Sequence, residues 1–339
     1  MFAMKAYEIP KSATKLEDLR RIERPDPKPG PRDVFVRLRA AALNYRDHAI
    51  IAGKYRYGLD HDTIPCSDGA GEVVAVGENV TRFKPGDRVI PTFFQVWIDG
   101  APPKNRAALG APLDGTLAEF ISLHEDGWVA MPPSLSFEEA AALPCAGATA
   151  WNALMAAGTR IKPGDTVLCL GTGGVSMFAL QFARAAGCRV IVTSSSDAKI
   201  ERARALGASD GVNYKTHPDW EKEVLALTGG RGVDCVIENG GIGTLARSFE
   251  CVGYSGKVAL IGVLAGPQGN ANPHDLMFKN ASLIGIGVGS RALLEQLIQA
   301  IEVNRIKPVI DKVFPFDQAP EAFRLQASGN FLGKIGITI

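Results

Sequence analysis

The stretch TVLCLGTGGVSMFALQFARAAGCRVIVTS (residues 166–194) decides the fold of this chain. An apolar run at 166–170 is followed by the glycine turn GTGG (171–174), by an amphipathic segment at 175–187 and by a second apolar run at 189–194. This order predicts a strand, a helix and a second strand. Because both runs are apolar at nearly every position, we expect strands of a parallel sheet that is covered on both faces.

The alternation of apolar runs with helical patterns continues beyond this stretch. Further apolar runs at 233–240, 257–263 and 282–289 predict three more strands, and a helical pattern at 291–306 follows them. Strands that alternate with helices indicate an α/β fold with a doubly wound parallel sheet.

The chain before residue 150 has a different character. Short β-branched runs at 34–43, 69–77 and 87–94 are separated by turn clusters, which predicts a compact antiparallel sheet domain. The segment 95–116 fits neither period and carries three prolines, so we expect a long loop there.

Composition limits the class of partner. The 339 residues are 46% hydrophobic and 22% charged, which is typical of a globular protein. The 37 Lys and Arg residues nearly balance the 36 Asp and Glu residues, so no basic field favours nucleic acid or an anionic membrane. We therefore expect a small-molecule partner, with neither nucleic acid nor membrane.

Cysteine usage and the N-terminus bear on the compartment. The six cysteines are widely spaced without a C-x-x-C pair, which predicts neither a disulfide framework nor a zinc ribbon. The first residues lack the apolar core of a secretory signal, and the uncharged segment 140–159 is Ala-rich and broken by proline and glycine. We expect a cytoplasmic protein.

The glycine turn carries the strongest chemical signal. Gly171 permits a tight turn, Gly173 lets a pyrophosphate approach the backbone, and the N–H groups at the start of the following helix stabilise negative charge. Ser176 stands where the G-x-G-x-x-G pattern has its last glycine. We interpret the turn as a dinucleotide site; the alternative is a structural glycine turn.

The end of the next strand distinguishes the two nicotinamide cofactors. An NAD site places Asp or Glu there to bind the ribose hydroxyls, whereas this strand ends in Thr193-Ser194. Ser194, Lys199 and Arg202 can instead donate hydrogen bonds and charge to a 2′-phosphate, which favours NADP(H). The alternative is that Lys199 and Arg202 lie on a solvated helix face and pair with Glu201.

At this point the chain resembles a known family. The sequence is similar to the medium-chain dehydrogenase/reductase superfamily over essentially its whole length, through GAGEVVAVGENVTRFKPGDRV (69–89), LCLGTGGVS (168–176), VIVTSSSDAKIERARALGA (190–208) and GVNY (211–214). The resemblance implies a β-rich, partly open barrel (GroES-like) catalytic domain of residues 1–150 and 291–339 and a Rossmann domain of residues 151–290. It also implies a homodimer or tetramer, with the strand at 282–289 at the subunit edge; the alternative is an inner strand of one subunit.

The positions that bind catalytic zinc in alcohol dehydrogenases of this family correspond here to Asn44, Ser67 and Cys145. Amide and hydroxyl groups are poor zinc ligands, and the region 91–118, where a structural zinc lobe would lie, has no cysteine. We therefore expect no metal. The motif Asn44-Tyr45-Arg46-Asp47 resembles the N-x-x-D motif of the zinc-independent quinone oxidoreductase-like branch.

Without a metal, fixed hydrogen-bond donors must stabilise the oxyanion that grows on the substrate during hydride transfer. The candidate catalytic residues are Asn44, Tyr45, Arg46, Asp47 and Tyr55, with Arg46 as an electrostatic clamp and Tyr45 or Tyr55 as a donor. In the alternative, Asn44 and Asp47 only shape the loop, and Arg46 pairs with Asp47 or Asp68.

The resemblance also implies which residues contact the cofactor. In the glycine turn and at the start of the following helix they are Gly171, Thr172, Gly173, Gly174 and Val175. At and beyond the end of the strand at 189–194 they are Ser194, Lys199 and Tyr214, and at the ends of later strands they are Asn239, Gly240, Gly262, Val263, Val288 and Gly289. Thr149 and Lys334 join them.

These inferences favour a zinc-independent, NADPH-dependent oxidoreductase that transfers a hydride to a quinone or an α,β-unsaturated carbonyl. Such substrates delocalise the negative charge that a metal would otherwise neutralise. The alternatives are an NADP-linked alcohol dehydrogenase or carbonyl reductase and a non-catalytic NADPH-binding protein.

Overall fold

A computed structural model describes residues 3–55 and 59–339. The chain divides into two compact units: Met1–Ala148 with Gly289–Ile339, and Thr149–Val288. Each boundary lies two residues before the one expected from the sequence. We refer to them as the β-rich unit and the nucleotide-fold unit.

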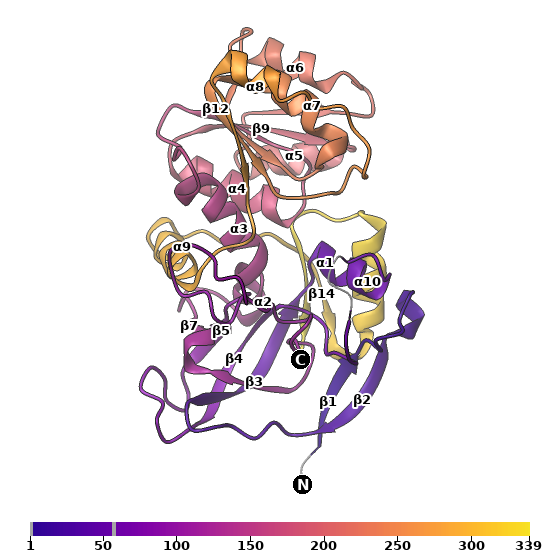
Figure 1. Cartoon of the computed structure of the whole chain (residues 1–339), viewed down its shortest axis with the longest axis vertical. Coiled ribbons are helices and arrows are strands. Elements are labelled where there is room, and N and C mark those ends of the chain that lie inside the picture. Colours follow the sequence, from indigo (N-terminus) through magenta and orange to yellow (C-terminus); the bar gives the residue numbers. More distant parts are fainter. Residues whose placement is uncertain (1–2, 56–58) are drawn as a thin grey trace. The chain divides into compact units, whose positions relative to one another are not determined.

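The nucleotide-fold unit is built on one parallel sheet (Figure 1). Within the described residues the strand order is β10-β9-β8-β11-β12-β13, so successive strands move outward from β8 to one edge and then return to its other side. This reversal at β8 is the topological switch point of a doubly wound sheet, and it confirms the predicted fold class. The strands are β8 (Thr166–Cys169), β9 (Arg189–Ser194), β10 (Asp210–Asn213), β11 (Val233–Glu238), β12 (Val252–Leu260) and β13 (Ser282–Gly285).

Helices accompany these strands and bury their apolar side chains. Leu168 of β8, Ile191 of β9 and Phe249 of a helix all belong to one hydrophobic cluster and are almost inaccessible. Val167 and Leu168, consecutive residues of β8 whose side chains point to opposite faces of the sheet, are both fully buried. This burial on both faces explains why the strands are apolar throughout. The helices are α3 (Ala148–Trp151), η4 (Asn152–Ala156), α4 (Gly174–Ala185), α5 (Asp197–Ala205), α6 (Trp220–Leu227), α7 (Ile242–Cys251) and α8 (His274–Lys279).

The last strand is shorter than the sequence predicts. The apolar run at 282–289 indicated a strand over its whole length, but β13 ends at Gly285. Val288 has a φ of 60°, a left-handed conformation that cannot continue a strand. The chain therefore turns away at this point, next to the boundary between the units.

The β-rich unit holds a larger, mainly antiparallel sheet. Its order in the described residues is β14-β15-β3-β4-β5-β7, and β6 pairs with β3 off this path. The strands are β3 (Asp33–Ala42), β4 (Asp68–Val76), β5 (Arg88–Pro91), β6 (Phe120–His124), β7 (Trp128–Ala130), β14 (Ile310–Pro315) and β15 (Lys334–Thr338), with a separate pair β1 (Ala3–Glu8) and β2 (Arg20–Pro25).

Helices and short turns complete the β-rich unit. In Figure 1, α10 lies beside β14, and the two elements are in contact. The helices are η1 (Leu16–Asp18), α1 (Tyr45–Ile51), η2 (Glu125–Gly127), α2 (Phe137–Ala141), η3 (Leu143–Gly147), α9 (Arg291–Asn304), η5 (Phe316–Gln318) and α10 (Ala319–Ser328).

The C-terminal strand is the feature of this sheet that positions the candidate site. β15 pairs antiparallel with β3, with Gly336 opposite Ala42, and β3 pairs antiparallel with β4, with Ala42 opposite Asp68. The first residue of β15, the first residue of β4 and the residues after β3 therefore meet at one end of the sheet.

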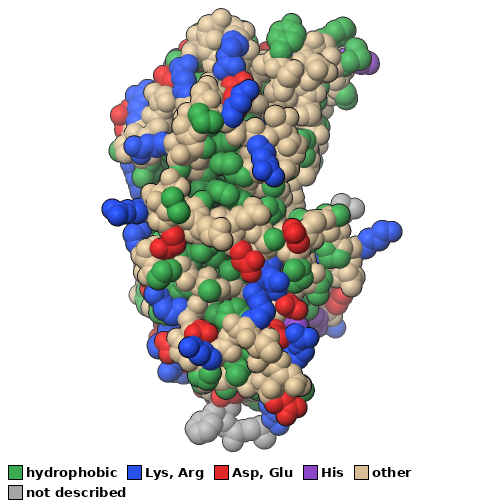
Figure 2. All heavy atoms as spheres, turned by 90° about the vertical axis from the view of Figure 1, so that its left-hand side faces the viewer, with side chains coloured by type: hydrophobic (Ala, Val, Ile, Leu, Met, Phe, Trp, Pro, Cys, Tyr) green, Lys and Arg blue, Asp and Glu red, His purple; other side chains and the backbone are tan. Residues whose placement is uncertain are grey.

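The surface carries no block of one charge on the face that Figure 2 shows: Lys and Arg side chains are interspersed with Asp and Glu. Among the described residues, no helix combines the length and the apolar character needed to cross a bilayer.

Candidate active site

Four polar side chains form a closed ring where β3, β4 and β15 meet. Lys334 Nζ donates to Asn44 Oδ1 at 2.6 Å and to Asp68 Oδ2 at 3.3 Å. Asn44 Nδ2 donates to Ser67 Oγ at 3.4 Å, and Ser67 Oγ donates to Asp68 Oδ1 at 2.9 Å. We call these four residues the Lys334 ring.

The third hydrogen bond of the ammonium goes to the backbone. Lys334 Nζ donates to the carbonyl oxygen of Leu43 at 2.6 Å. An ammonium has three N–H bonds and no acceptor, so each donor of Lys334 has its acceptor within the chain. Lys334 is only 3% exposed and Asp68 is fully buried, which makes this a desolvated ion pair with its hydrogen bonds satisfied.

Helix α1 begins directly at the ring. Asn44 is its N-cap, and the backbone N–H of Asn44 donates to Asp47 Oδ2 at 2.7 Å. Asp47 is fully buried, and Oδ1 has no hydrogen-bond partner among the described residues. Burial raises the pKa of the Asp47 carboxyl to about 6, although the neighbouring Arg46 guanidinium opposes the shift.

Arg46 is occupied by the loop that the sequence predicted at 95–116. Its two terminal nitrogens donate to the carbonyl oxygens of Leu109 at 2.7 Å and Ala111 at 3.0 Å. Its guanidinium carbon lies 5.1 Å from the ring centroid of Tyr55 and 4.9 Å from that of Phe93. In this structure the buried Arg46 therefore anchors the loop.

The two tyrosine candidates lie in different settings. Tyr55 accepts a hydrogen bond from Arg46 Nε at 3.4 Å, so its hydroxyl is next to the anchored loop. Tyr45 is the first residue of α1 and is 52% exposed. The structure thus brings Asn44 and Asp47 together and places Arg46 and Tyr55 in a second group beside them.

The residues at the expected zinc positions do not fit a zinc ion. Asn44 Oδ1 already accepts from an ammonium, and the Ser67 hydroxyl donates to a carboxylate. Cys145 is the one thiol among the three positions, and a single thiolate does not hold a zinc ion, which takes at least three protein ligands. In the described ranges 3–55 and 59–339, no group of three or more His, Cys, Asp or Glu side chains is placed to hold a metal.

In the nucleotide-fold unit, the glycine turn lies between β8 and α4, at the switch point. Gly171 has a φ of 76°, a left-handed conformation that favours glycine. Gly173 has a φ of −77°, and a Cβ built on it would meet no heavy atom within 4 Å. Nothing within the described chain requires glycine at 173, so the residue keeps a backbone surface open, as a pyrophosphate needs.

The N-terminus of α4 also suits an anion. Its N-cap is Gly173, which provides no side-chain cap, so the first N–H groups of this twelve-residue helix remain for a ligand. These features fit the pyrophosphate of a nicotinamide cofactor.

Ser176 has a role that the sequence did not predict. Its hydroxyl donates to the carbonyl oxygen of Leu170 at 2.8 Å and accepts from Asn239 Nδ2 at 2.9 Å. Asn239 Nδ2 also donates to Leu170 O at 3.2 Å. The serine in place of the third glycine therefore joins the end of β8 to the end of β11.

Glu238 is a further residue that sequence analysis missed. This buried carboxylate accepts from the backbone N–H groups of Gly240 and Gly241 at 2.7 and 2.9 Å and from Thr244 Oγ1 at 2.7 Å, and it contacts Ser248 Oγ. It fixes the turn that follows Asn239. The available signal was an acidic residue at the end of an apolar strand, directly before Asn-Gly-Gly.

The residues expected at the adenosine end gather beyond β9 and β10. Ser194 is buried at the end of β9, and the N–H of Tyr214 donates to its carbonyl oxygen at 3.0 Å. Asp197, at the start of α5 like Lys199, accepts from Asn213 Nδ2 at 2.8 Å. The sequence analysis did not consider Asp197, whose carboxylate is held by this amide.

The other expected cofactor residues fall on both sides of the unit boundary. Thr149, Thr172, Gly174, Val175, Gly240, Gly262, Val263 and Val288 belong to the nucleotide-fold unit with the residues above. Gly289 and Lys334 belong to the β-rich unit, where Lys334 is a member of the ring around Asn44.

Two family models match the chain. Residues 30–133 match the alcohol dehydrogenase GroES-like domain, and residues 174–303 match the zinc-binding dehydrogenase domain. A zinc-type alcohol dehydrogenase-like protein of Schizosaccharomyces pombe is 44% identical over 319 residues, which cover 92% of each chain. A quinone oxidoreductase of Pseudomonas aeruginosa is 34% identical over 306 residues, which cover 87% of each chain.

A solved structure of an NAD-dependent alcohol dehydrogenase agrees with these matches. It superposes with a TM-score of 0.91 at 34% identity, covering 99% of this chain and 100% of that one. The likeness extends over both units, and the solved structure is that of a dehydrogenase described as NAD-dependent. With the GroES-like and Rossmann units described above, these matches establish that the chain belongs to the medium-chain dehydrogenase/reductase superfamily, as an oxidoreductase of the alcohol dehydrogenase/quinone oxidoreductase type.

Proposed function

We propose that this protein is a zinc-independent, NADPH-dependent reductase of quinones or α,β-unsaturated carbonyl compounds. The observation that carries the proposal is the Lys334 ring, in which the positions of the family's zinc ligands hold an amide and a hydroxyl bound to an internal ammonium–carboxylate pair. Hydrogen-bond donors, and no metal, would then stabilise the charge on the substrate.

Different residues would bind the cofactor and stabilise the charge on the substrate. The backbone around Gly173 and the start of α4 would hold the pyrophosphate. When bound, the reduced nicotinamide supplies a hydride to a substrate carbon. The C=C electron pair then moves onto the conjugated oxygen, and a solvent proton completes the reduction. The Asn44 amide would donate to that oxygen while it carries charge.

Two of the relatives support different substrates. The likeness to a quinone oxidoreductase favours the quinone or enone reading, whereas the likeness to an NAD-dependent alcohol dehydrogenase favours alcohol oxidation or carbonyl reduction. The Lys334 ring supports the quinone or enone reading, because an unactivated ketone concentrates the charge on one oxygen, where a metal ion is of most use. Carbonyl reduction is the second candidate.

The experiment follows oxidation of NADPH, and of NADH in parallel, by protein dialysed against a chelator. The acceptors are a 1,4-benzoquinone, a 2-enone and a simple aldehyde. We expect turnover with the quinone or the enone after metal removal, and no gain on adding zinc. Turnover with the aldehyde alone, or only after zinc is added, would favour the carbonyl reductase. Tight NADPH binding without any turnover would indicate a non-catalytic protein.

The preference for NADPH rests on Ser194. We expect Ser194→Asp to lower the ratio of kcat/KM for NADPH to that for NADH by about 100-fold, because a carboxylate beside a 2′-phosphate adds like-charge repulsion. Ser194→Ala is the matched control, since it removes the hydroxyl without adding charge and should change the ratio by less than about 10-fold. An unchanged ratio in Ser194→Asp would place the 2′-phosphate elsewhere.

We also propose a homodimer formed at β13. This strand pairs with β12 on one side and ends the sheet within the described residues. Leu283 on this strand is an exposed large hydrophobic residue. Light scattering should give twice the 36.1 kDa chain mass, and Leu283→Lys should give the single mass. Val303→Lys, on exposed Val303 of α9, is the control that should leave the mass unchanged.

A further inference from the structure

The ammonium of Lys334 determines which atoms donate and which accept in the hydrogen bonds of the Lys334 ring. An ammonium can only donate, so the Asn44 atom that faces Lys334 at 2.6 Å must be the amide oxygen. The NH₂ group of Asn44 must then face the other way, toward Ser67. Ser67 in turn donates to Asp68, which leaves its lone pairs to accept from Asn44.

Asn44 is the member of the ring that reaches the surface of the β-rich unit. Lys334, Ser67 and Asp68 are buried, whereas Asn44 is only half-buried. The ring uses one of the two N–H bonds of the Asn44 amide, so the second can donate to a bound oxygen. The buried hydrogen bonds of the ring therefore leave one N–H of the Asn44 amide, in a fixed orientation, at the surface of the β-rich unit.

We propose that Lys334 is a positioning residue for hydride transfer: it fixes the orientation of the Asn44 amide, so that an N–H donor faces the substrate oxygen. This inference rests on the proposed function. Without the ammonium, the Asn44 side-chain amide could rotate by about 180° and point its oxygen at the substrate, where it would repel the developing negative charge. Lys334 acts through Asn44, because its own three donors are bound to Leu43, Asn44 and Asp68.

The first test is the kinetics of Lys334→Met. We expect kcat for quinone or enone reduction to fall by about 10- to 100-fold, a loss comparable to that of a misdirected oxyanion donor. The dissociation constant for NADPH, measured by fluorescence, should change by less than about 3-fold, because all three donors of Lys334 are bound within the chain and none is left for the cofactor. Lys334→Arg keeps the positive charge but places a larger, planar group in the buried ring, so it should restore only part of kcat.

Lys257→Met is the matched control for the loss of a buried ammonium. Lys257 is as buried as Lys334, but its Nζ donates to the carbonyl oxygen of Ala157 in the nucleotide-fold unit. Its replacement should lower the thermal midpoint and leave kcat within about 2-fold. An equal loss of kcat in both variants would overturn the proposal, because it would attribute the effect to destabilisation alone.

A double-mutant cycle tests whether Lys334 acts through Asn44. Asn44→Ala and Lys334→Met should each lower kcat, and the double variant should be no slower than the slower single one. Effects that multiply would mean that Lys334 acts independently of Asn44, and the proposal would fail. If Lys334→Met does not fold, Lys334→Met with Asp68→Asn removes both charges of the pair and takes its place in the cycle.

A spectroscopic measurement separates this inference from the proposed function. The side-chain amide signal of Asn44, assigned by its loss in Asn44→Ala, should shift in Lys334→Met and stay in place in Lys257→Met. If the wild-type protein reduces neither quinones nor enones, the proposed function fails, while this shift still reports whether Lys334 orients the amide. An unshifted signal overturns the inference whatever the activity.

Discussion

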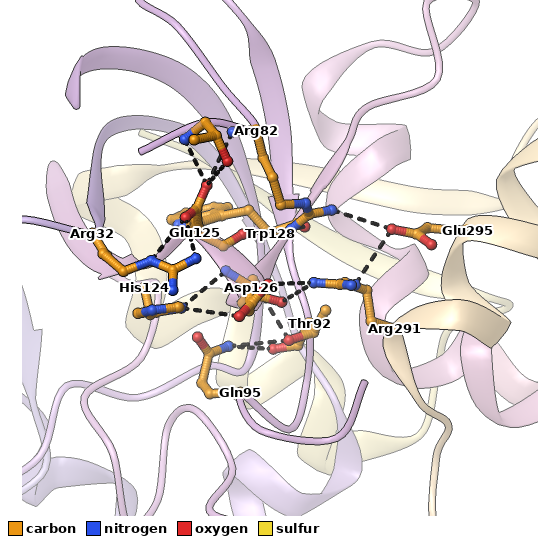
Figure 3. Close-up of polar contacts among 12 residues, drawn as sticks. Arg32, Arg82, Thr92, Gln95, His124, Glu125, Asp126, Trp128, Arg291 and Glu295 are labelled. Carbon is orange, nitrogen blue, oxygen red and sulfur yellow. Dashed lines mark hydrogen bonds and ion pairs between the residues drawn. The ribbon is translucent and has the colours of Figure 1, made fainter. Parts of the chain in front are cut away.

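Replacing Glu125 by Gln is expected to lower the free energy of unfolding of the β-rich unit by about 2–4 kcal/mol at pH 7. The Glu125 carboxylate is fully buried and belongs to the cluster of polar residues that Figure 3 labels, between Arg32 and Arg82. It accepts from Arg32 Nη2 at 2.7 Å and from the backbone N–H groups of Thr81 and Arg82 at 2.9 and 3.0 Å. Glutamine keeps the size but replaces an acceptor oxygen with a donor and removes the charge.

The cluster explains why the loss should be large. Glu125 joins the segment before β3, through Arg32, to the turn between β4 and β5, through Thr81 and Arg82. Next to it, Arg291 at the start of α9 donates to Asp126 Oδ1 at 2.8 Å, as Figure 3 shows. One carboxylate therefore connects segments that are far apart in the sequence.

The pH dependence of this effect has a definite sign. Burial raises the pKa of the Glu125 carboxyl, but the Thr81 N–H, the Arg32 guanidinium and the Arg82 N–H outweigh burial and bring the pKa to about 2. A carboxyl whose folded pKa lies below the unfolded value of 4.5 stabilises the fold above pH 4.5, and this contribution is lost as the pH falls toward 2. The difference in free energy of unfolding between the wild type and Glu125→Gln should therefore become smaller below pH 4.5.

Urea denaturation at pH 7 and at pH 3.5 measures both parts of this prediction. Glu295→Gln is the control, because Glu295 is partly exposed and contacts Arg82 at 3.3 Å. Its loss should cost less than about 1 kcal/mol. Equal stability losses in the two variants, or a loss for Glu125→Gln that does not change with pH, would contradict the role of Glu125 in joining Arg32 to Thr81 and Arg82.

The sequence predicted the elements whose signals are local. The apolar runs around 166–170 and 189–194 predicted β8 and β9, and the glycine turn between them lies at the switch point of the sheet. Both signals depend on neighbouring residues, because a buried parallel strand and a tight turn each restrict their own residue types. The doubly wound fold could therefore be inferred without any long-range information.

The Lys334 ring could not be derived in this way. Lys334 and Asn44 are brought together by the pairing of β15 with β3, two strands at opposite ends of the sequence. A short apolar strand near the C-terminus does not specify its partner, so the sequence placed Lys334 with the cofactor residues by resemblance alone. Ser176 shows the same limit, since its bond to Asn239 depends on the adjacency of β8 and β11.

Replacing Arg46 by Met is expected to lower the free energy of unfolding by about 3–5 kcal/mol. The change leaves the carbonyl oxygens of Leu109 and Ala111 without the donors that now bind them. It also removes the cation that opposes the raised pKa of Asp47. A carboxyl whose pKa is higher in the folded than in the unfolded protein lowers stability as the pH rises above the unfolded pKa. Because the pKa of Asp47 rises further without Arg46, the stability lost in Arg46→Met should be greater at pH 8 than at pH 5.

The measurement combines urea denaturation with hydrogen exchange of residues 95–116. We expect Arg46→Met to speed exchange in this loop, because the guanidinium fork holds two of its carbonyl groups. Arg46→Lys keeps the charge but cannot bind both carbonyls with a planar fork, so it should recover only part of the stability. Arg106→Met on the same loop is the control, since exposed Arg106 donates to Pro103 O within the loop itself.

The result for Arg46 also decides what the N-x-x-D segment contributes to the reaction. If Arg46→Met is unstable but retains kcat per folded molecule, Arg46 is a structural anchor and Asn44 remains the donor that acts on the substrate. If Arg46→Met is stable and loses kcat, the guanidinium itself stabilises the negative charge on the substrate. The two bonds to Leu109 and Ala111 favour the first outcome, because donors already committed to backbone carbonyls would have to leave them to reach a ligand.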